Sequence, residues 1–125
     1  MVGDVNIAKI YLGGPMTGLP HFNAPAFRKA AEALRIMGND VFSPVERNDK
    51  AFGRDITLGN PTGDPKQLAQ DEGFSLREAF IDDLTYLCRE ADTIALLPGW
   101  QDSKGARAEY AVAMALGLNV IELTP

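Results

Sequence analysis

The chain of 125 residues is long enough for one domain with a single hydrophobic core, but not for two. Hydrophobic residues make up 46% of it and charged residues 23%, as in an ordinary globular protein. The net charge of −5 argues against a polymeric nucleic acid as partner, because that ligand requires a basic face, but it permits a single nucleotide bound at a helix N-terminus.

Hydropathy and the number of cysteines indicate in which compartment of the cell we expect the protein. No apolar segment approaches ~18 residues, and the start of the chain lacks a basic region followed by an apolar one. We therefore expect neither a membrane span nor a signal peptide. Cys88 is the only cysteine, which excludes an intramolecular disulfide and favours a reducing, cytoplasmic compartment.

The first predicted strand, residues 7–13 (IAKIYLG), ends at the glycine-rich stretch GGPMTG. This stretch does not fit G-x-G-x-x-G, so it does not indicate a dinucleotide site. Glycines after a strand nevertheless permit close approach of the backbone to a ligand. Simple turn formation is the alternative explanation for Gly14 and Gly18. The loop residues that we predict to contact substrate are Gly14, Pro15, Met16 and Thr17.

Apolar residues at helical spacing predict a first helix between an N-cap at Asn23 and a C-cap at Gly38, followed by a short strand at residues 40–43. From residue 45 to 73, glycines and Asn/Asp-Pro pairs interrupt every pattern. We expect little regular structure there, apart from a short helix that starts at Asp64-Pro65 and runs through Gln70. An irregular segment of this length is typical of a mobile flap or insertion beside a binding site.

The second long helix is predicted to open at Ser75, which has capping-box spacing to Glu78. Asp83 falls on the mostly apolar face of this helix, where a carboxylate requires a hydrogen-bond partner or a wet cavity. A surface charge is the alternative interpretation. Asp82 points away from that face and should be exposed to solvent. Asp92, which begins the next strand, is favoured to cap a neighbouring backbone segment.

The C-terminal part of the chain predicts a strand-loop-helix-strand unit with a right-handed crossover. Residues 93–97 have the length of a buried parallel strand, residues 100–104 form a polar loop, a helix runs to Gly117, and residues 119–123 form the last strand. The whole chain therefore predicts an α/β fold with a small doubly wound, flavodoxin- or Rossmann-like parallel sheet. We expect four to five strands in the order 2-1-3-4, helices on both faces, and one domain over residues 1–125 with a flap at about 45–73.

Ligands of open parallel sheets bind beyond the carboxyl ends of the strands. Residues at that edge after the third strand are Trp100, Asp102, Ser103, Gly105 and Glu109. The helix dipole favours an ionised Glu109, as a carboxylate nucleophile requires, and Ser103 with the nearby amides forms an anion cradle. A solvated glutamate and an N-cap serine explain the same residues more simply. The indole of Trp100 is equally suited to stacking on a base and to covering a subunit interface.

Three motifs occur along the chain in this order: IYLGGPMTG, DDLTYLCREADTIALLPGW and DSKGARAEYAVAMALG. With them the chain resembles the nucleoside 2-deoxyribosyltransferase superfamily. It is especially similar to a small branch of phage and bacterial proteins that carry YLAGPMTG and LPGW-x-x-S-x-G-A-x-x-E, and to the 2′-deoxynucleoside 5′-phosphate N-hydrolases. The resemblance covers nearly the whole chain except residues 45–73.

The resemblance implies roles for individual residues. Glu109 matches the glutamate that attacks the anomeric carbon of the sugar, and Asp83 matches the aspartate that protonates or orients the leaving base. Tyr11 matches a tyrosine that lines the site near the nucleophile. Ser103 matches the serine with which nucleotide N-glycosidases bind phosphate, where transferases acting on free nucleosides carry aspartate. A carboxylate there would repel a phosphate dianion, whereas a hydroxyl can donate to it.

One departure from the pattern concerns the loop at residues 16–18, which lacks the arginine that the nucleotide hydrolases carry near Thr17. Lys104 or Arg107 would have to replace that positive charge. Phosphate affinity or base selection would differ accordingly.

The resemblance implies cleavage of the N-glycosidic bond of a (deoxy)nucleoside 5′-monophosphate through a glycosyl-enzyme ester, which yields a free base and (deoxy)ribose 5-phosphate. The alternatives are base exchange by a nucleoside 2-deoxyribosyltransferase, a non-catalytic nucleotide sensor, and an accessory protein without a ligand. We expect no cofactor and no metal, because His21 is the only histidine, sits in a loop and belongs to no Cys/His cluster. The expected partners are a small nucleotide or nucleoside and further copies of the chain in a homo-oligomer, with no membrane and no polymeric nucleic acid.

Overall fold

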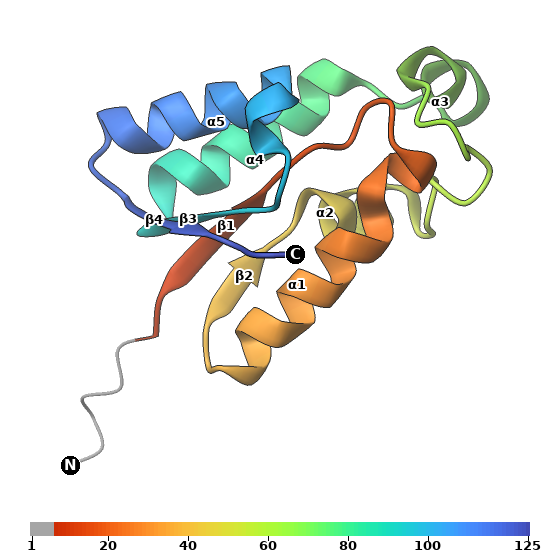
Figure 1. The fold of residues 1–125 in the computed structure, drawn as a ribbon. Coiled ribbons are helices and arrows are strands. Elements are labelled where there is room, and N and C mark those ends of the chain that lie inside the picture. The colour runs from red at the N-terminus through yellow and green to blue at the C-terminus, as the bar shows by residue number, and fades with distance from the viewer. Residues whose placement is uncertain (1–6) are drawn as a thin grey trace.

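A computed structural model describes residues 7–125 of the chain. Four parallel strands form one sheet in the order β2-β1-β3-β4 (Figure 1). The strands are β1 (Lys9–Gly13), β2 (Asp40–Phe42), β3 (Thr93–Leu96) and β4 (Asn119–Glu122). The helices are α1 (Ala24–Ile36), α2 (Pro44–Phe52), α3 (Pro65–Glu72), α4 (Leu76–Arg89) and α5 (Lys104–Ala115), with short helical turns η2 (Pro20–Asn23) and η3 (Trp100–Asp102). The predicted α/β fold and strand order are confirmed.

Helices cover both faces of the sheet, with α1 on one side and α4 and α5 on the other (Figure 1). Side chains alternate along β1, so Ile10 and Leu12 pack against Phe27 of α1. Tyr11 points to the opposite face and packs with Leu87 of α4 and with α5. Because both faces of β1 and β3 are buried, these strands are apolar at almost every position.

Serine side chains cap the N-termini of two long helices, α4 and α5. Ser75 Oγ accepts from the N–H of Glu78 at 3.2 Å at the start of α4, as its capping-box spacing predicts. Asn23 occupies the N-cap position of α1, but its side chain does not cap the helix. Its backbone is left-handed, with φ of 61°, and its Nδ2 donates to the Pro15 carbonyl at 3.0 Å. The expected cap at Asn23 is therefore wrong, because the amide is turned toward the first loop.

The expectation of little regular structure in residues 45–73 is wrong for α2, whereas the short helix expected from Asp64-Pro65 is confirmed as α3. The segment contains most of α2 and all of α3, and only residues 53–64 and Gly73 lack a helix. The interruptions are helix boundaries: Pro44 and Pro65 lie in the first turns, and Gly53 and Gly73 take left-handed φ values of 73° at the C-caps. Proline at the start of a helix and glycine at its end stabilise short helices rather than break them.

The predicted cap at Asp92 and the predicted exposure of Asp82 are confirmed. Both carboxylate oxygens of Asp92 accept from the Lys9 N–H at 3.1 Å, so Asp92 caps the start of β1. Asp82 is exposed and pairs with Arg47 of α2 at 2.8 Å. That ion pair joins α2 to α4 and fixes the wall of the cavity described below.

The edge strand β4 is exposed along its length, and Val120 and Ile121 each keep 38% of their surface accessible. Among residues 7–125, no helix combines the length and the apolar character that crossing a membrane requires.

Candidate active site

Tyr11 and Glu109 form a buried hydrogen bond where β1 meets α5. The Tyr11 hydroxyl donates to Glu109 Oε2 at 2.6 Å, and the two residues are 0% and 7% exposed. Burial, reinforced by the charges of Glu109 and Asp83, raises the pKa of Tyr11 well above its ordinary value. Tyr11 therefore keeps its proton and acts as a fixed donor that orients the carboxyl group of Glu109.

Asp83 of α4 lies beside this pair. It is 7% exposed, and its Oδ1 has no hydrogen-bond partner among the described residues. The single hydroxyl proton of Tyr11 is directed at Glu109, so it does not serve Asp83. The interpretation of Asp83 as a surface charge is wrong. A buried carboxyl oxygen without a protein partner is expected where a ligand or a proton supplies the missing bond.

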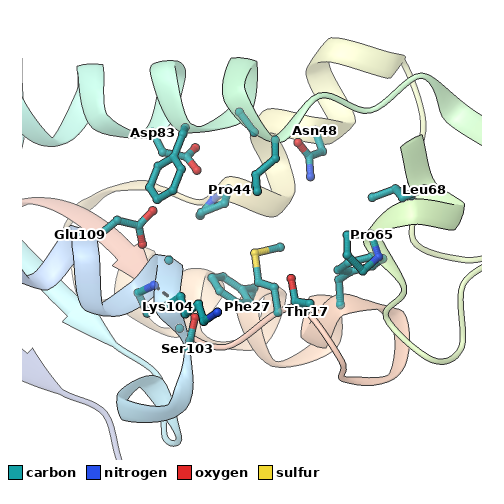
Figure 2. A pocket seen from close by; sticks show the side chains of 18 of the residues that line it. Thr17, Phe27, Pro44, Asn48, Pro65, Leu68, Asp83, Ser103, Lys104 and Glu109 are labelled. Carbon is teal, nitrogen blue, oxygen red and sulfur yellow. Dashed lines mark hydrogen bonds between the residues drawn. The ribbon is translucent and has the colours of Figure 1, made fainter. Parts of the chain in front are cut away.

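A cavity of about 580 Å³ opens in front of the two carboxyl groups. Figure 2 shows Asp83 reaching down from α4 and Glu109 reaching across from α5 toward the same end of it. The sequence-predicted residues that line the cavity are Gly14, Met16, Thr17, Asp83, Asp102, Ser103, Gly105 and Glu109. Within residues 7–125, no three His, Cys, Asp or Glu side chains gather as a metal site would require.

Burial dominates the ionisation of both carboxyl groups. It raises the pKa of Glu109 to about 8, while the Tyr11 hydrogen bond lowers it and the charge of Asp83 raises it further. Burial also raises the pKa of Asp83 to about 7, against the lowering effect of Arg47. The expectation that the helix dipole keeps Glu109 ionised is therefore wrong. A dipole contributes at most ~2 kcal/mol, and desolvation of this side chain outweighs it.

The start of α5 lies at the cavity, where an anion cradle is predicted. Ser103 is the N-cap, and its Oγ accepts from the Ala106 N–H at 3.2 Å. The hydroxyl proton remains available for a second bond, and the first amides of a helix have no acceptor within it. Ser103, Lys104 and Gly105 all line the cavity, whereas Arg107 does not. Of the two cations considered for phosphate, Lys104 is the one at the site.

The loop after β1 is shaped by a left-handed turn. His21, Phe22 and Asn23 have φ values of 53°, 53° and 61°, a conformation that costs a non-glycine residue about 1–2 kcal/mol. Backbone N–H groups of Gly18 and His21 donate to carbonyls of residues 57–64, which holds the turn in place. The turn places Phe22 in the cavity wall and directs the His21 ring to a backbone carbonyl, so His21 is a loop residue as expected.

Close packing explains one of the loop glycines. A Cβ on Gly14 would lie 2.7 Å from Leu97 Cβ, so the chain passes too near the end of β3 for any side chain. Gly18 has φ of 84° and open space around it, which fits a simple turn. Gly14 also lines the cavity, whereas Gly18 does not.

Residues 8–122 match the protein family described as "Domain of unknown function (DUF4406)". The match covers almost the entire chain. The protein belongs to this family. No curated protein and no solved structure matches it.

In this member of the DUF4406 family, Tyr11 is fully buried and is not among the residues that line the cavity, although it was expected to line the site. Two residues predicted to contact substrate, Trp100 and Pro15, also lie outside the cavity. Trp100 packs on Tyr110, with ring centroids 4.7 Å apart, and donates from Nε1 to Glu122 Oε1 at 3.1 Å. Pro15 uses its carbonyl to accept from Asn23. Neither position was distinguishable by sequence, because Pro15 flanks two residues that line the cavity and Trp100 lies in the same loop as Asp102, which also does.

Sequence interpretation missed the wall that α2, α3 and the intervening turn contribute. Its members are Pro44, Asn48, Thr57, Pro65, Leu68 and Phe74. They carry no catalytic motif, and the segment was expected to be irregular. The available signal was helical spacing: Pro44 and Asn48 are four residues apart and share one face of α2.

Proposed function

We propose that this protein cleaves the N-glycosidic bond of a (deoxy)nucleoside 5′-monophosphate. The observation that carries the proposal is the buried carboxyl group of Glu109, oriented by Tyr11 at 2.6 Å and next to Asp83 at one end of the cavity. Two carboxyl groups at one site, one as nucleophile and one as acid, are the requirement for glycoside cleavage with a covalent intermediate. The resemblance to the nucleoside 2-deoxyribosyltransferase superfamily supports the same assignment.

The reaction has two steps. In the first, a Glu109 carboxylate oxygen bonds to C1′ of the sugar while the bond from C1′ to the base nitrogen breaks. The electron pair of that bond stays with the base, which takes a proton from Asp83. In the second, water attacks C1′ of the ester, Asp83 accepts a proton from the water, and (deoxy)ribose 5-phosphate leaves with Glu109 restored.

This cycle needs one proton on the carboxyl pair, located on Asp83. Glu109 ionises with a pKa of about 8 and Asp83 with a pKa of about 7, so the pair loses its two protons in neighbouring steps. The rate should therefore follow a bell-shaped profile near neutral pH. It falls at low pH because both carboxyl groups are protonated, and at high pH because both have lost their protons. Between these limits the single proton lies mostly on Glu109, and the reactive form, with the proton on Asp83, is the minor one.

The start of α5 supports a phosphate rather than a free 5′-hydroxyl. Ser103, Lys104 and Gly105 offer a hydroxyl proton, a positive charge and helix N-terminal amides to the cavity. The expected consequence is that Ser103→Asp weakens the apparent affinity for a monophosphate by at least about tenfold. The corresponding nucleoside should be much less affected, because it brings no negative charge to the introduced carboxylate.

The direct test is incubation of the protein with deoxynucleoside and ribonucleoside 5′-monophosphates, with and without an added acceptor base. Free base together with sugar phosphate in the absence of acceptor is the expected result. Glu109→Gln should abolish release of base, and Glu32→Gln, an exposed glutamate on α1, should leave it intact.

Strict dependence on the acceptor base would instead identify a transferase. Binding of nucleotides without turnover, unchanged in Glu109→Ala, would identify a sensor. Either result, or no binding at all, would overturn the proposed hydrolysis.

A further inference from the structure

The cavity extends away from the carboxyl pair to a second polar group, the side-chain amide of Asn48 on α2. Asn48 is 6% exposed and lines the cavity. Figure 2 shows its amide nitrogen pointing into the cavity, between α2 above and the first loop below. The surrounding wall is mostly apolar and includes Phe27 and Phe74, with Thr17 and Thr57 as further polar members. A few polar groups on a mostly apolar wall are the usual arrangement for orienting a flat ligand.

Arg47 fixes which end of that amide faces the cavity. Its Nη1 donates to Asn48 Oδ1 at 2.9 Å, and its Nε donates to Asp82 Oδ2 at 2.8 Å. The Arg47 side chain is only 13% exposed, so α2, α4 and the ion pair hold the guanidinium in place. A guanidinium has donors and no acceptor. A flipped amide would bring its NH₂ against those donors, so the oxygen must face Arg47 and the NH₂ must face the cavity.

We propose that Asn48, held by Arg47, selects a nucleobase that presents a ring carbonyl to this wall over one that presents an exocyclic amine. The inference rests on the proposed function, because it takes the ligand at this wall to be the base of a nucleotide. A carbonyl accepts the Asn48 N–H, whereas an amine would set donor against donor and leave the buried amide unpaired. The expected substrates are therefore 6-oxopurine and 4-oxopyrimidine nucleotides.

Two ligand pairs isolate this one group. Deoxyinosine and deoxyadenosine monophosphates differ chiefly at the 6-oxo or 6-amino position of the base, and deoxyuridine and deoxycytidine monophosphates at the 4-oxo or 4-amino position. Affinities are measured by calorimetry in Glu109→Gln protein, so that no turnover intervenes. The oxo member should bind about tenfold more tightly than the amino member in at least one pair, which is the effect expected of one buried hydrogen bond gained or lost.

Three variants in the same Glu109→Gln background test the origin of the preference. Asn48→Asp offers only acceptors to the cavity and can still pair with Arg47, so the preference should invert toward the amino member. Arg47→Met removes the donor that fixes the amide, and the ratio of affinities should fall toward one even though Asn48 is present. Arg47→Lys can still donate to Asn48 Oδ1 and should keep most of the ratio. Thermal unfolding confirms that each variant is folded.

The ratio of affinities separates this role from a purely structural one, because a loosened α2 would weaken both members of a pair alike. A ratio near one in both pairs, or a ratio that Asn48→Asp leaves unchanged, overturns the inference. The preference in binding without any release of base would refute the proposed hydrolysis and leave the inference standing. Hydrolysis of the oxo and amino members of each pair at equal rates would support the proposed hydrolysis and refute the inference about Asn48.

Discussion

Replacing Glu109 with glutamine should make the stability of the protein much less dependent on pH. The pKa of Glu109 is raised from an ordinary value of 4.5 to about 8, chiefly by burial. Between these values the folded protein keeps a proton that the unfolded chain has lost, so the free energy of unfolding falls as pH rises. The contribution of Glu109 is most favourable below pH 4.5 and is fully lost above pH 8.

The magnitude follows from the same two values. Each pH unit in that window removes up to ~1.4 kcal/mol of stability, and the whole window removes roughly 5 kcal/mol. Little of this is screened by solvent, since Glu109 is 7% exposed. Glutamine is neutral at every pH and can still accept from Tyr11. Glu109→Gln should therefore match the wild type near pH 4.5 and exceed it by several kcal/mol at pH 8.5.

Urea unfolding at half-unit pH steps from 4.5 to 9 measures this difference directly. Thermal unfolding gives a second readout, at about 4 °C per kcal/mol for a domain of this size. Glu32→Gln is the matched control, because it removes an exposed carboxylate from α1 and should give a small, nearly constant difference. A gap between Glu109→Gln and the wild type that is equal at pH 5 and pH 8.5 would refute the assignment of a buried, protonated Glu109.

Three further substitutions test other parts of the site. Tyr11→Phe removes the hydrogen bond that lowers the pKa of Glu109, the higher of the two pKa values, so the alkaline limb of the profile of kcat/KM against pH for a nucleotide should move to higher pH; an unshifted limb would exclude Tyr11 as a partner of the nucleophile. Gly14→Ala places a Cβ 2.7 Å from Leu97 Cβ and should lower the stability by about 1–3 kcal/mol in thermal unfolding, and an unchanged Tm would contradict the close approach. Trp100→Phe breaks a hydrogen bond to β4 outside the cavity, so release of base should stay within about twofold of the wild type, whereas a loss of tenfold or more would show that Trp100 touches substrate.

The fold could be predicted because its signals are local. Apolar runs of strand length, helical stripes and the Gly-Pro boundaries between them place β1, β3, α1, α4 and α5 along the chain, and the right-handed crossover then restricts the strand order. The same signals predicted the short helix α3 but failed for α2. Prolines and glycines stand close together in this part of the chain, so the boundaries of α2 looked like part of one irregular segment.

The candidate site could be predicted only in part. The position of Glu109 after the third strand placed it at the carboxyl edge of the sheet, the family resemblance assigned Asp83 to the same site, and the structure brings both to one cavity. Their ionisation could not be predicted, because it depends on the depth at which β1 and the two helices bury them. No motif in the sequence marked Asn48 as a residue of the site. Its role depends on which end of the amide faces Arg47, and that is a matter of contact geometry.

By itself the sequence determined the order of strands and helices and the two acids that the site contains, because spacing and turn chemistry act over a few residues. The tertiary structure alone decided how those acids are protonated, which wall faces them, and that Trp100 lies elsewhere. Those properties arise from desolvation and from contacts between segments up to 98 positions apart, such as Tyr11 and Glu109, and no local pattern encodes them.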